Sequence, residues 1–165
     1  MSSFDKDLEK NSSNYVPLTP LSFISRVKDI YPNYESLIYG NRSYTWLQTY
    51  ERCTKFASAL TKQGIGKGST VSIIAANTPE LFEAHYSIPM TGGVINTINT
   101  RLDAETIAYI LDHSDAKLLI TDTQFSPTMK KALKIYGKKI PIIDIHDEQA
   151  NFKEDEGEKI GDSTY

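Results

Sequence analysis

Residues 70–98 read TVSIIAANTPELFEAHYSIPMTGGVINTI, and this stretch determines the fold class. Residues 70–75 form a near-continuous apolar run, typical of a strand that is buried on both faces. A helix is predicted over residues 79–90, and Gly92–Gly93 ends it before a second strand over residues 94–98. A strand, a helix and a strand of these lengths indicate a βαβ unit with parallel strands.

The same alternation continues toward the C-terminus. Asp103 is placed to cap a helix, and residues 117–121 have the apolar pattern of a strand. Another helix follows Pro127, and a last strand is predicted over residues 140–145. Because right-handed crossovers join parallel strands, helices are expected on both faces. The predicted fold class is α/β, a partial doubly wound parallel sheet with flanking helices.

The segment before this alternation is predicted to hold two helices and a small hairpin. The first helix begins at Thr19–Pro20, with threonine as N-cap and proline in the first turn. Strands over residues 36–39 and 43–46 form the hairpin. The longest helix follows and ends at Gly64, the usual position of a C-terminal glycine.

Composition divides the chain into three parts. Residues 1–18 are polar and are expected to form an extended N-terminal arm. Residues 19–146 hold every predicted helix and strand and are expected to form one α/β domain. Residues 147–165 include seven acidic residues and little apolar content, so an exposed end is expected there.

Charge and cysteine content exclude several classes of protein. The chain has 165 residues, a mass of 18.5 kDa and a net charge of -3, so no nucleic-acid partner is expected. The single cysteine, Cys53, excludes a disulfide framework and a multi-cysteine metal site. No run approaches the roughly eighteen apolar residues of a membrane span. The first residues lack the apolar core of a signal peptide, so a cytoplasmic location is expected.

The glycines of residues 64–68 resemble a phosphate loop in composition only. Their spacing departs from the phosphate-loop pattern. A helix also runs into a strand here, whereas a phosphate loop runs from a strand into a helix. The segment is therefore interpreted as a glycine turn that ends a helix.

The histidines form no site by their spacing. His85, His113 and His146 lie far apart and lack metal-ligand spacing with carboxylates or the cysteine, so no metal site is predicted. His85 shares a predicted helix side with Phe82 and Ile88 and is interpreted as a core histidine. In an apolar setting its imidazole can titrate near neutral pH, which leaves a functional role open.

Several short blocks of the sequence have the order and spacing of a known protein family. The densest is residues 89–103, PMTGGVINTINTRLD, and further blocks follow at residues 107–114 and 119–122. Tyr44–Thr45–Trp46 precedes them. In order and spacing the blocks resemble AMP-forming acyl-CoA synthetases, and they are similar to the short- and medium-chain acid branch of the adenylate-forming superfamily. The resemblance extends over residues 14–125.

This resemblance implies a two-step reaction with ATP, Mg²⁺ and coenzyme A. A small carboxylic acid attacks the α-phosphate of ATP, which gives acyl-adenylate and pyrophosphate, and the thiol of coenzyme A then displaces AMP. Mg²⁺ neutralises phosphate charge. The family's phosphate loop, adenosine motif and C-terminal lysine do not occur in residues 1–165. We therefore expect the N-terminal segment of an acid–CoA ligase, an incomplete domain that is inactive alone and has no catalytic residue of its own.

Three positions are expected to have a supporting role. They are His85 and, in the loop after the strand over residues 94–98, Asn99 and Arg101. A surface ion pair between Arg101 and Asp103, the helix cap, explains that arginine more simply. Cofactor-binding residues are not assigned by the sequence.

The alternative function is a stand-alone α/β module that binds a partner without catalysis. Its open sheet edge would need a cover from another subunit, whereas the remainder of the enzyme covers that edge in an intact ligase. A free-standing nucleotide binder is disfavoured because the glycine-rich turn from strand to helix is missing. The identity of the acid, the oligomeric state and an organelle location through a C-terminal signal stay open.

Overall fold

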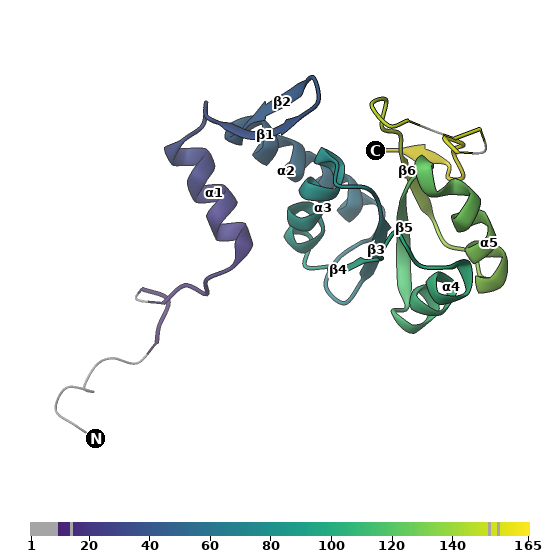
Figure 1. Cartoon of the computed structure of the whole chain (residues 1–165). Coiled ribbons are helices and arrows are strands. Elements are labelled where there is room, and N and C mark those ends of the chain that lie inside the picture. The colour runs from purple at the N-terminus through teal and green to yellow at the C-terminus, as the bar shows by residue number, and fades with distance from the viewer. Residues whose placement is uncertain (1–9, 14, 152, 155) are drawn as a thin grey trace.

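The computed structural model describes residues 10–13, 15–151, 153–154 and 156–165 (Figure 1). The bounds of the helices and strands are α1 (Pro20–Ile30), β1 (Glu35–Tyr39), β2 (Arg42–Thr45), α2 (Trp46–Lys62), β3 (Thr70–Ile74), α3 (Pro79–Met90), β4 (Val94–Thr97), α4 (Ala104–His113), β5 (Ala116–Asp122), α5 (Ser126–Tyr136), β6 (Ile142–Ile145) and β7 (Ser163–Thr164). Up to β6, helices and strands follow one another in the order that the sequence pattern predicts, and the strand β7 was not predicted. No helix of the described residues has both the length and the apolar character to cross a membrane.

A five-stranded parallel sheet forms the centre of the molecule. Its strand order is β4-β3-β5-β6-β7, while β1 and β2 form a separate antiparallel hairpin. Helices α2 and α3 pack on one face of the sheet, and α4 and α5 pack on the other. Figure 1 shows α1 and the hairpin at the end of the molecule opposite α4 and α5. The structure therefore confirms the predicted α/β class with helices on both faces.

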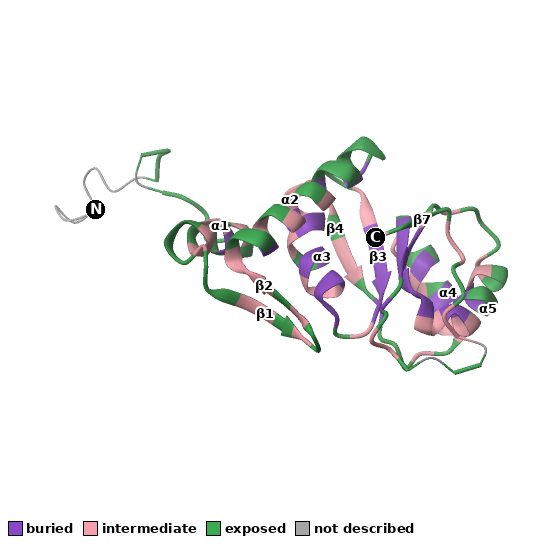
Figure 2. Ribbon diagram, turned by 90° about the horizontal axis from the view of Figure 1, so that it is seen from above, coloured by how far each residue is buried: buried purple, intermediate pink, exposed green. Residues whose placement is uncertain are grey.

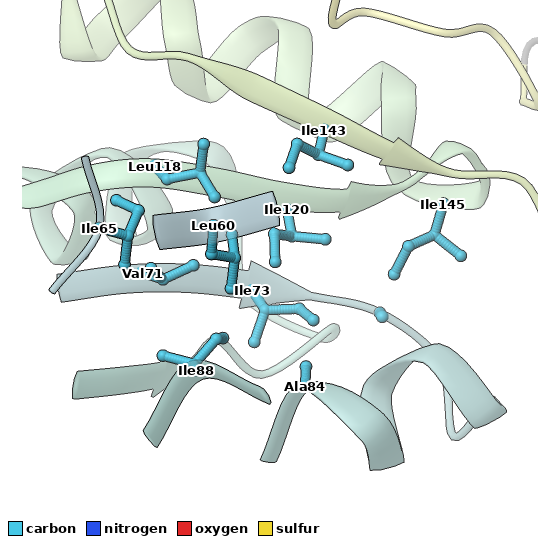
Figure 3. Packing of buried hydrophobic residues seen from close by; sticks show 11 residues of the cluster. Leu60, Ile65, Val71, Ile73, Ala84, Ile88, Leu118, Ile120, Ile143 and Ile145 are labelled. Atoms are coloured by element: carbon cyan, nitrogen blue, oxygen red, sulfur yellow. The ribbon is translucent and has the colours of Figure 1, made fainter. Parts of the chain in front are cut away.

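Alternate side chains of each central strand enter opposite halves of the core. Val71 and Ile73 of β3 lie in the half that α2 and α3 cover, where Figure 3 shows them beside Ile88. Ile74 points to the other half and packs with Ile107 of α4. Each fully buried side chain of this size contributes about 1.5–3 kcal/mol of transfer free energy. Burial on both faces thus explains the apolar run that predicts β3.

Side-chain caps fix the starts of α1, α2, α3 and α4. The hydroxyls of Thr19, Thr45 and Thr78 accept hydrogen bonds from the first turns of α1, α2 and α3. The carboxylate of Asp103 does the same for α4, with its Oδ1 atom 2.7 Å from the Thr106 amide nitrogen. These caps satisfy amides that have no partner within the helix. They account for the accuracy with which the helix starts were predicted.

The C-terminal segment differs from the predicted exposed end. Asp147 is buried, and Ser163–Thr164 adds the parallel strand β7 to β6. The buried carboxylate of Asp144 accepts hydrogen bonds from the amides of Ile160 and Gly161, at 3.1 and 2.7 Å. This contact returns the chain to the sheet, although most of the described side chains between Asp147 and Ile160 are exposed. Of the predicted N-terminal arm, residues 1–9 and 14 lie outside the described residues.

Candidate functional site

Two neighbouring strands send the chain to opposite faces of the sheet. After β3 the chain enters α3 on one face, and after β5 it enters α5 on the other. Strands β3 and β5 are hydrogen-bonded neighbours. In doubly wound sheets, ligands bind in the crevice at the carboxyl ends of such a strand pair. The candidate site therefore lies at the carboxyl edge of β3 and β5.

Buried carboxylates gather at this edge. Asp122 is the last residue of β5, Asp147 follows β6, and Glu80 lies in the first turn of α3. Their exposed fractions are 1%, 3% and 7%. Because a buried charge is costly unless it is paired and hydrogen-bonded, their partners decide what this site can bind.

The turn of the β1–β2 hairpin supplies these partners. Arg42 Nη1 donates to Glu80 Oε1 at 2.8 Å, and Arg42 Nη2 lies 3.7 Å from Asp147 Oδ1. The Tyr39 hydroxyl donates to Asp147 Oδ2 at 2.5 Å. The side-chain amide of Gln149 donates to the Tyr39 carbonyl oxygen at 3.2 Å. Residues more than a hundred positions apart thus hold the hairpin over the carboxyl edge.

The carboxyl edge of the sheet carries more negative than positive charge. Burial raises the pKa of Asp122, and the charges of Asp147 and Glu80 raise it further. The pKa of Tyr39 is raised to about 12, chiefly because its hydroxyl donates to Asp147, and burial adds to the effect. Three carboxylates here face one guanidinium, that of Arg42. This excess of negative charge stabilises the protonated form of Asp122.

A second ion pair, between a buried carboxylate and a partly exposed guanidinium, joins α2 to α3. Arg52 Nε and Nη2 donate to the two carboxylate oxygens of Glu83 at 2.5 and 3.0 Å, and the Tyr165 hydroxyl donates to Glu83 Oε2 at 2.8 Å. Cys53 lies 3.7 Å from the Glu83 carbonyl oxygen and is fully buried. Burial raises the pKa of the Cys53 thiol to about 12, so it stays protonated and unreactive at neutral pH.

A cleft of about 610 Å³ runs along both ion pairs. Its walls come from the hairpin, α2, α3, residues 146–149 and Tyr165. The guanidinium groups of Arg42 and Arg52 in these walls are already paired with carboxylates. They are therefore not free to clamp phosphates. Lys55 is the remaining lysine or arginine among the residues that line the cleft, and one ammonium group does not by itself fit these walls to ATP with Mg²⁺. His146 also lines the cleft, with its Nδ1 atom 3.2 Å from Thr123 Oγ1.

The prediction that His85 is a core histidine is wrong. Its imidazole is exposed, and its Nδ1 atom donates to the Leu81 carbonyl oxygen at 2.8 Å. The buried face of α3 instead includes Glu83 and Ser87 together with Ile88. The sequence pattern missed this face because Glu83 is buried with its charge paired by an arginine of α2. His85 lines a second, apolar pocket of about 370 Å³ between β1 and α3.

The loop after β4 lies apart from these pockets. Asn99 Oδ1 accepts a hydrogen bond from the Arg101 amide at 2.9 Å, which closes a local turn, and both side chains are exposed. Among the described residues, the ion pairs do not include the predicted one between Arg101 and Asp103. The structure therefore does not bring Asn99 or Arg101 together with His85, and a supporting role for the three stays a prediction.

The sequence did not predict the group of charged side chains at the carboxyl edge, which consists of Glu80, Asp122, Asp147 and Arg42. A usable signal exists for two of them, because Asp122 and Asp147 stand at the ends of predicted apolar strands. Carboxyl ends of parallel strands meet at one edge, so these two acids are brought together by the topology. No comparable signal marks Arg42, whose position depends on how the hairpin docks.

Comparison with known proteins identifies the family. The profile of the AMP-binding enzyme family matches residues 25–163. An acetate–CoA ligase of Humulus lupulus is 51% identical over 132 residues, which cover 80% of this chain and 23% of that enzyme. The peroxisomal benzoate–CoA ligase of Arabidopsis thaliana is 42% identical over 157 residues, which cover 90% and 27%. The chain belongs to the AMP-binding enzyme family, as its short sequence blocks predict.

Solved structures agree with this fold. The anthranilate CoA ligase AuaEII in complex with anthranoyl-AMP matches 82% of this chain and 26% of its own, with a TM-score of 0.73 and 21% identity. A benzoate CoA ligase from Burkholderia xenovorans matches 75% and 25%, with a TM-score of 0.69 and 23% identity. At these identities the likeness shows the fold alone. The chain spans about a quarter of the length of the curated relatives that it matches.

Proposed function

We propose that this chain is a segment of an AMP-forming acid–CoA ligase. The intact enzyme joins a carboxylate oxygen to the α-phosphorus of ATP and releases pyrophosphate. The thiol of coenzyme A then attacks the acyl carbon, forms the thioester and releases AMP. The observation that carries this proposal is the 42–51% identity to named acid–CoA ligases over most of the chain.

The proposed substrate is a small carboxylic acid with an apolar body. By their names, one relative acts on acetate, a second on acetate or butyrate, and a third on benzoate. These acids share one carboxylate on a short aliphatic or aromatic group. A second charge on the acid is therefore expected to abolish its use by the intact enzyme.

We further propose that residues 1–165 do not catalyse adenylation alone. Adenylation depends on preorganised positive charge around the phosphates. In the described residues the guanidinium groups of the cleft are neutralised by Glu80 and Glu83. ATP, Mg²⁺ and coenzyme A are accordingly assigned to residues outside this segment.

A segment exchange tests the proposal. A chimera is made in which this chain replaces the matching quarter of the Humulus lupulus acetate–CoA ligase. The chimera is expected to catalyse acetate-dependent ATP–pyrophosphate exchange, whereas the 165-residue chain alone gives none. An inactive but folded chimera would contradict the assignment to this enzyme class and favour a stand-alone α/β binding module.

The cellular location is part of the same proposal. We propose a cytoplasmic location for the intact enzyme. The names of five plant relatives include the word peroxisomal, which supports an organelle as the alternative. Fractionation of source cells with an antibody to residues 147–165 separates the two locations.

A further inference from the structure

Exposed apolar side chains are concentrated in one short part of the chain. Of the twelve large hydrophobic side chains that are exposed among the described residues, nine come from residues 15–47. The remaining three, Val94, Tyr109 and Ile135, are scattered over β4, α4 and α5. Single exposed apolar residues are ordinary, but a concentration of them marks an interaction surface.

Helix α1 carries two apolar stripes, of which only one is covered. Ile24 is 1% exposed on the side that packs against α2 and α3. Phe23 and Ile30 are 51% and 52% exposed. They stand seven residues apart and so lie on the same side of the helix. Figure 2 shows α1 at the end of the molecule away from α4 and α5, where the sheet does not reach it.

Further exposed apolar side chains follow α1 along the chain. The rings of Tyr31 and Tyr34 meet edge to face with their centroids 5.4 Å apart, and both rings are at least half exposed. Ile38 of β1 is 67% exposed and lines the apolar pocket between β1 and α3. We call these residues of α1 and the hairpin the hairpin-end surface: Phe23, Ile30, Tyr31, Tyr34 and Ile38.

We propose that the hairpin-end surface is an interface with the remainder of the AMP-binding enzyme, which covers it with an apolar face. This inference rests on the proposed function. Four of the five side chains lie within residues 25–163, the part that the family profile matches. About three quarters of each of these two curated relatives lies outside the matched segment, so a large part of the same enzyme can cover the hairpin-end surface. A second copy of the chain is the other possible occupant.

The test compares one double variant in two settings. Phe23→Asp with Ile30→Asp is made both in the 165-residue chain and in the chimera with the Humulus lupulus enzyme. Ile135→Asp is the matched control, since Ile135 is 54% exposed on the distant helix α5. Thermal unfolding is measured for both the 165-residue chain and the chimera. The sedimentation coefficient and the acetate-dependent ATP–pyrophosphate exchange are measured for the chimera.

The double variant is expected to leave the Tm of the 165-residue chain within about 2 °C, because its side chains already face water. In the chimera it is expected to lower the Tm by roughly 5–10 °C, since two carboxylates would be buried without partners. The exchange activity of the chimera is expected to fall by at least about tenfold in the double variant. Ile135→Asp is expected to change neither the Tm nor the exchange activity.

Each other outcome has a distinct meaning. An inactive chimera with an intact hairpin-end surface overturns the proposed function, and its Tm still tests the interface. A double variant that behaves like Ile135→Asp in the chimera overturns the interface and leaves the proposed function standing. A chimera that sediments as a dimer, and that the double variant converts to monomers, identifies a second copy as the occupant and also overturns the proposal.

Discussion

The Tyr39 hydroxyl donates a hydrogen bond to the buried carboxylate of Asp147 at 2.5 Å, across 108 positions of sequence. This contact ties the hairpin to the loop after β6 at the carboxyl edge of the sheet. The hairpin therefore depends on a residue in the segment whose acidic composition predicts an exposed end. Loss of the contact should loosen the hairpin before it affects the sheet.

Tyr39→Phe is expected to lower the free energy of unfolding by about 1–2 kcal/mol, because a buried carboxylate loses a hydrogen-bond donor. The pKa of Tyr39 is raised in the folded state from 10.0 to about 12. The stability that this tyrosine adds is therefore complete below pH 10 and is lost as the pH rises through about 12. Urea unfolding of both proteins between pH 7 and 12 measures the difference. Tyr34→Phe, at an exposed ring, is the control and should change nothing.

The ion pair of Arg52 with the buried carboxylate of Glu83 gives a second prediction. Arg52→Met leaves Glu83 buried with only the Tyr165 hydroxyl as side-chain donor, so a cost of about 2–3 kcal/mol is expected. Arg52→Met combined with Glu83→Gln should recover most of that loss, since no unpaired charge stays buried. A double-mutant cycle by urea unfolding measures the coupling.

Lys117→Met provides the comparison for this pair, because its ion pair with Asp115 is largely exposed. Its cost is expected to stay below about 0.5 kcal/mol. If Arg52→Met proves no more harmful than Lys117→Met, the pair between α2 and α3 does not have the importance that its burial indicates.

Asp122 should destabilise the fold at neutral pH. Burial raises its pKa above the ordinary value of 3.8, so the folded state holds the proton more tightly than the unfolded state. Stability from this group is present below the unfolded pKa and is lost as the pH rises through the folded pKa. Asp122→Asn is therefore expected to stabilise the protein at pH 7 and to have little effect near pH 3, measured by thermal unfolding across that range.

Asp103 serves as a comparison, because its contribution to stability is expected to change with pH in the opposite direction. The amide of Thr106 holds the pKa of Asp103 below its usual value. Stability from this group is present above the unfolded pKa and is lost as the pH falls. Asp103→Asn should thus remove a contribution that grows with pH. The same direction of change in both variants would refute the assignment for Asp122.

The helices and strands could be predicted because their determinants are local. Thr78 and Pro79 mark the start of α3 within one residue, and the apolar run of β3 follows from burial on both faces. The place of Arg42 at the carboxyl edge could not be predicted, because Arg42 meets Asp147 only once the hairpin has docked. The buried side of α3 was misjudged for a related reason, since pairing with Arg52 makes Glu83 a buried residue.

Gly161 is predicted to control the attachment of β7. A Cβ atom at this position would lie 2.4 Å from the carbonyl oxygen of Ile142 in β6, which cannot move without disturbing the sheet. Gly161→Ala should cost about 1–3 kcal/mol and expose the Tyr165 amide, which donates to the Asp144 carbonyl oxygen at 2.8 Å. Gly64→Ala is the control: its φ is +85° and nothing lies near its Cβ, so about 1 kcal/mol of backbone strain is expected without loss of protection at Tyr165. Hydrogen exchange at Tyr165 separates the two effects, and equal protection in both variants would show that Gly161 does not hold β7 in place.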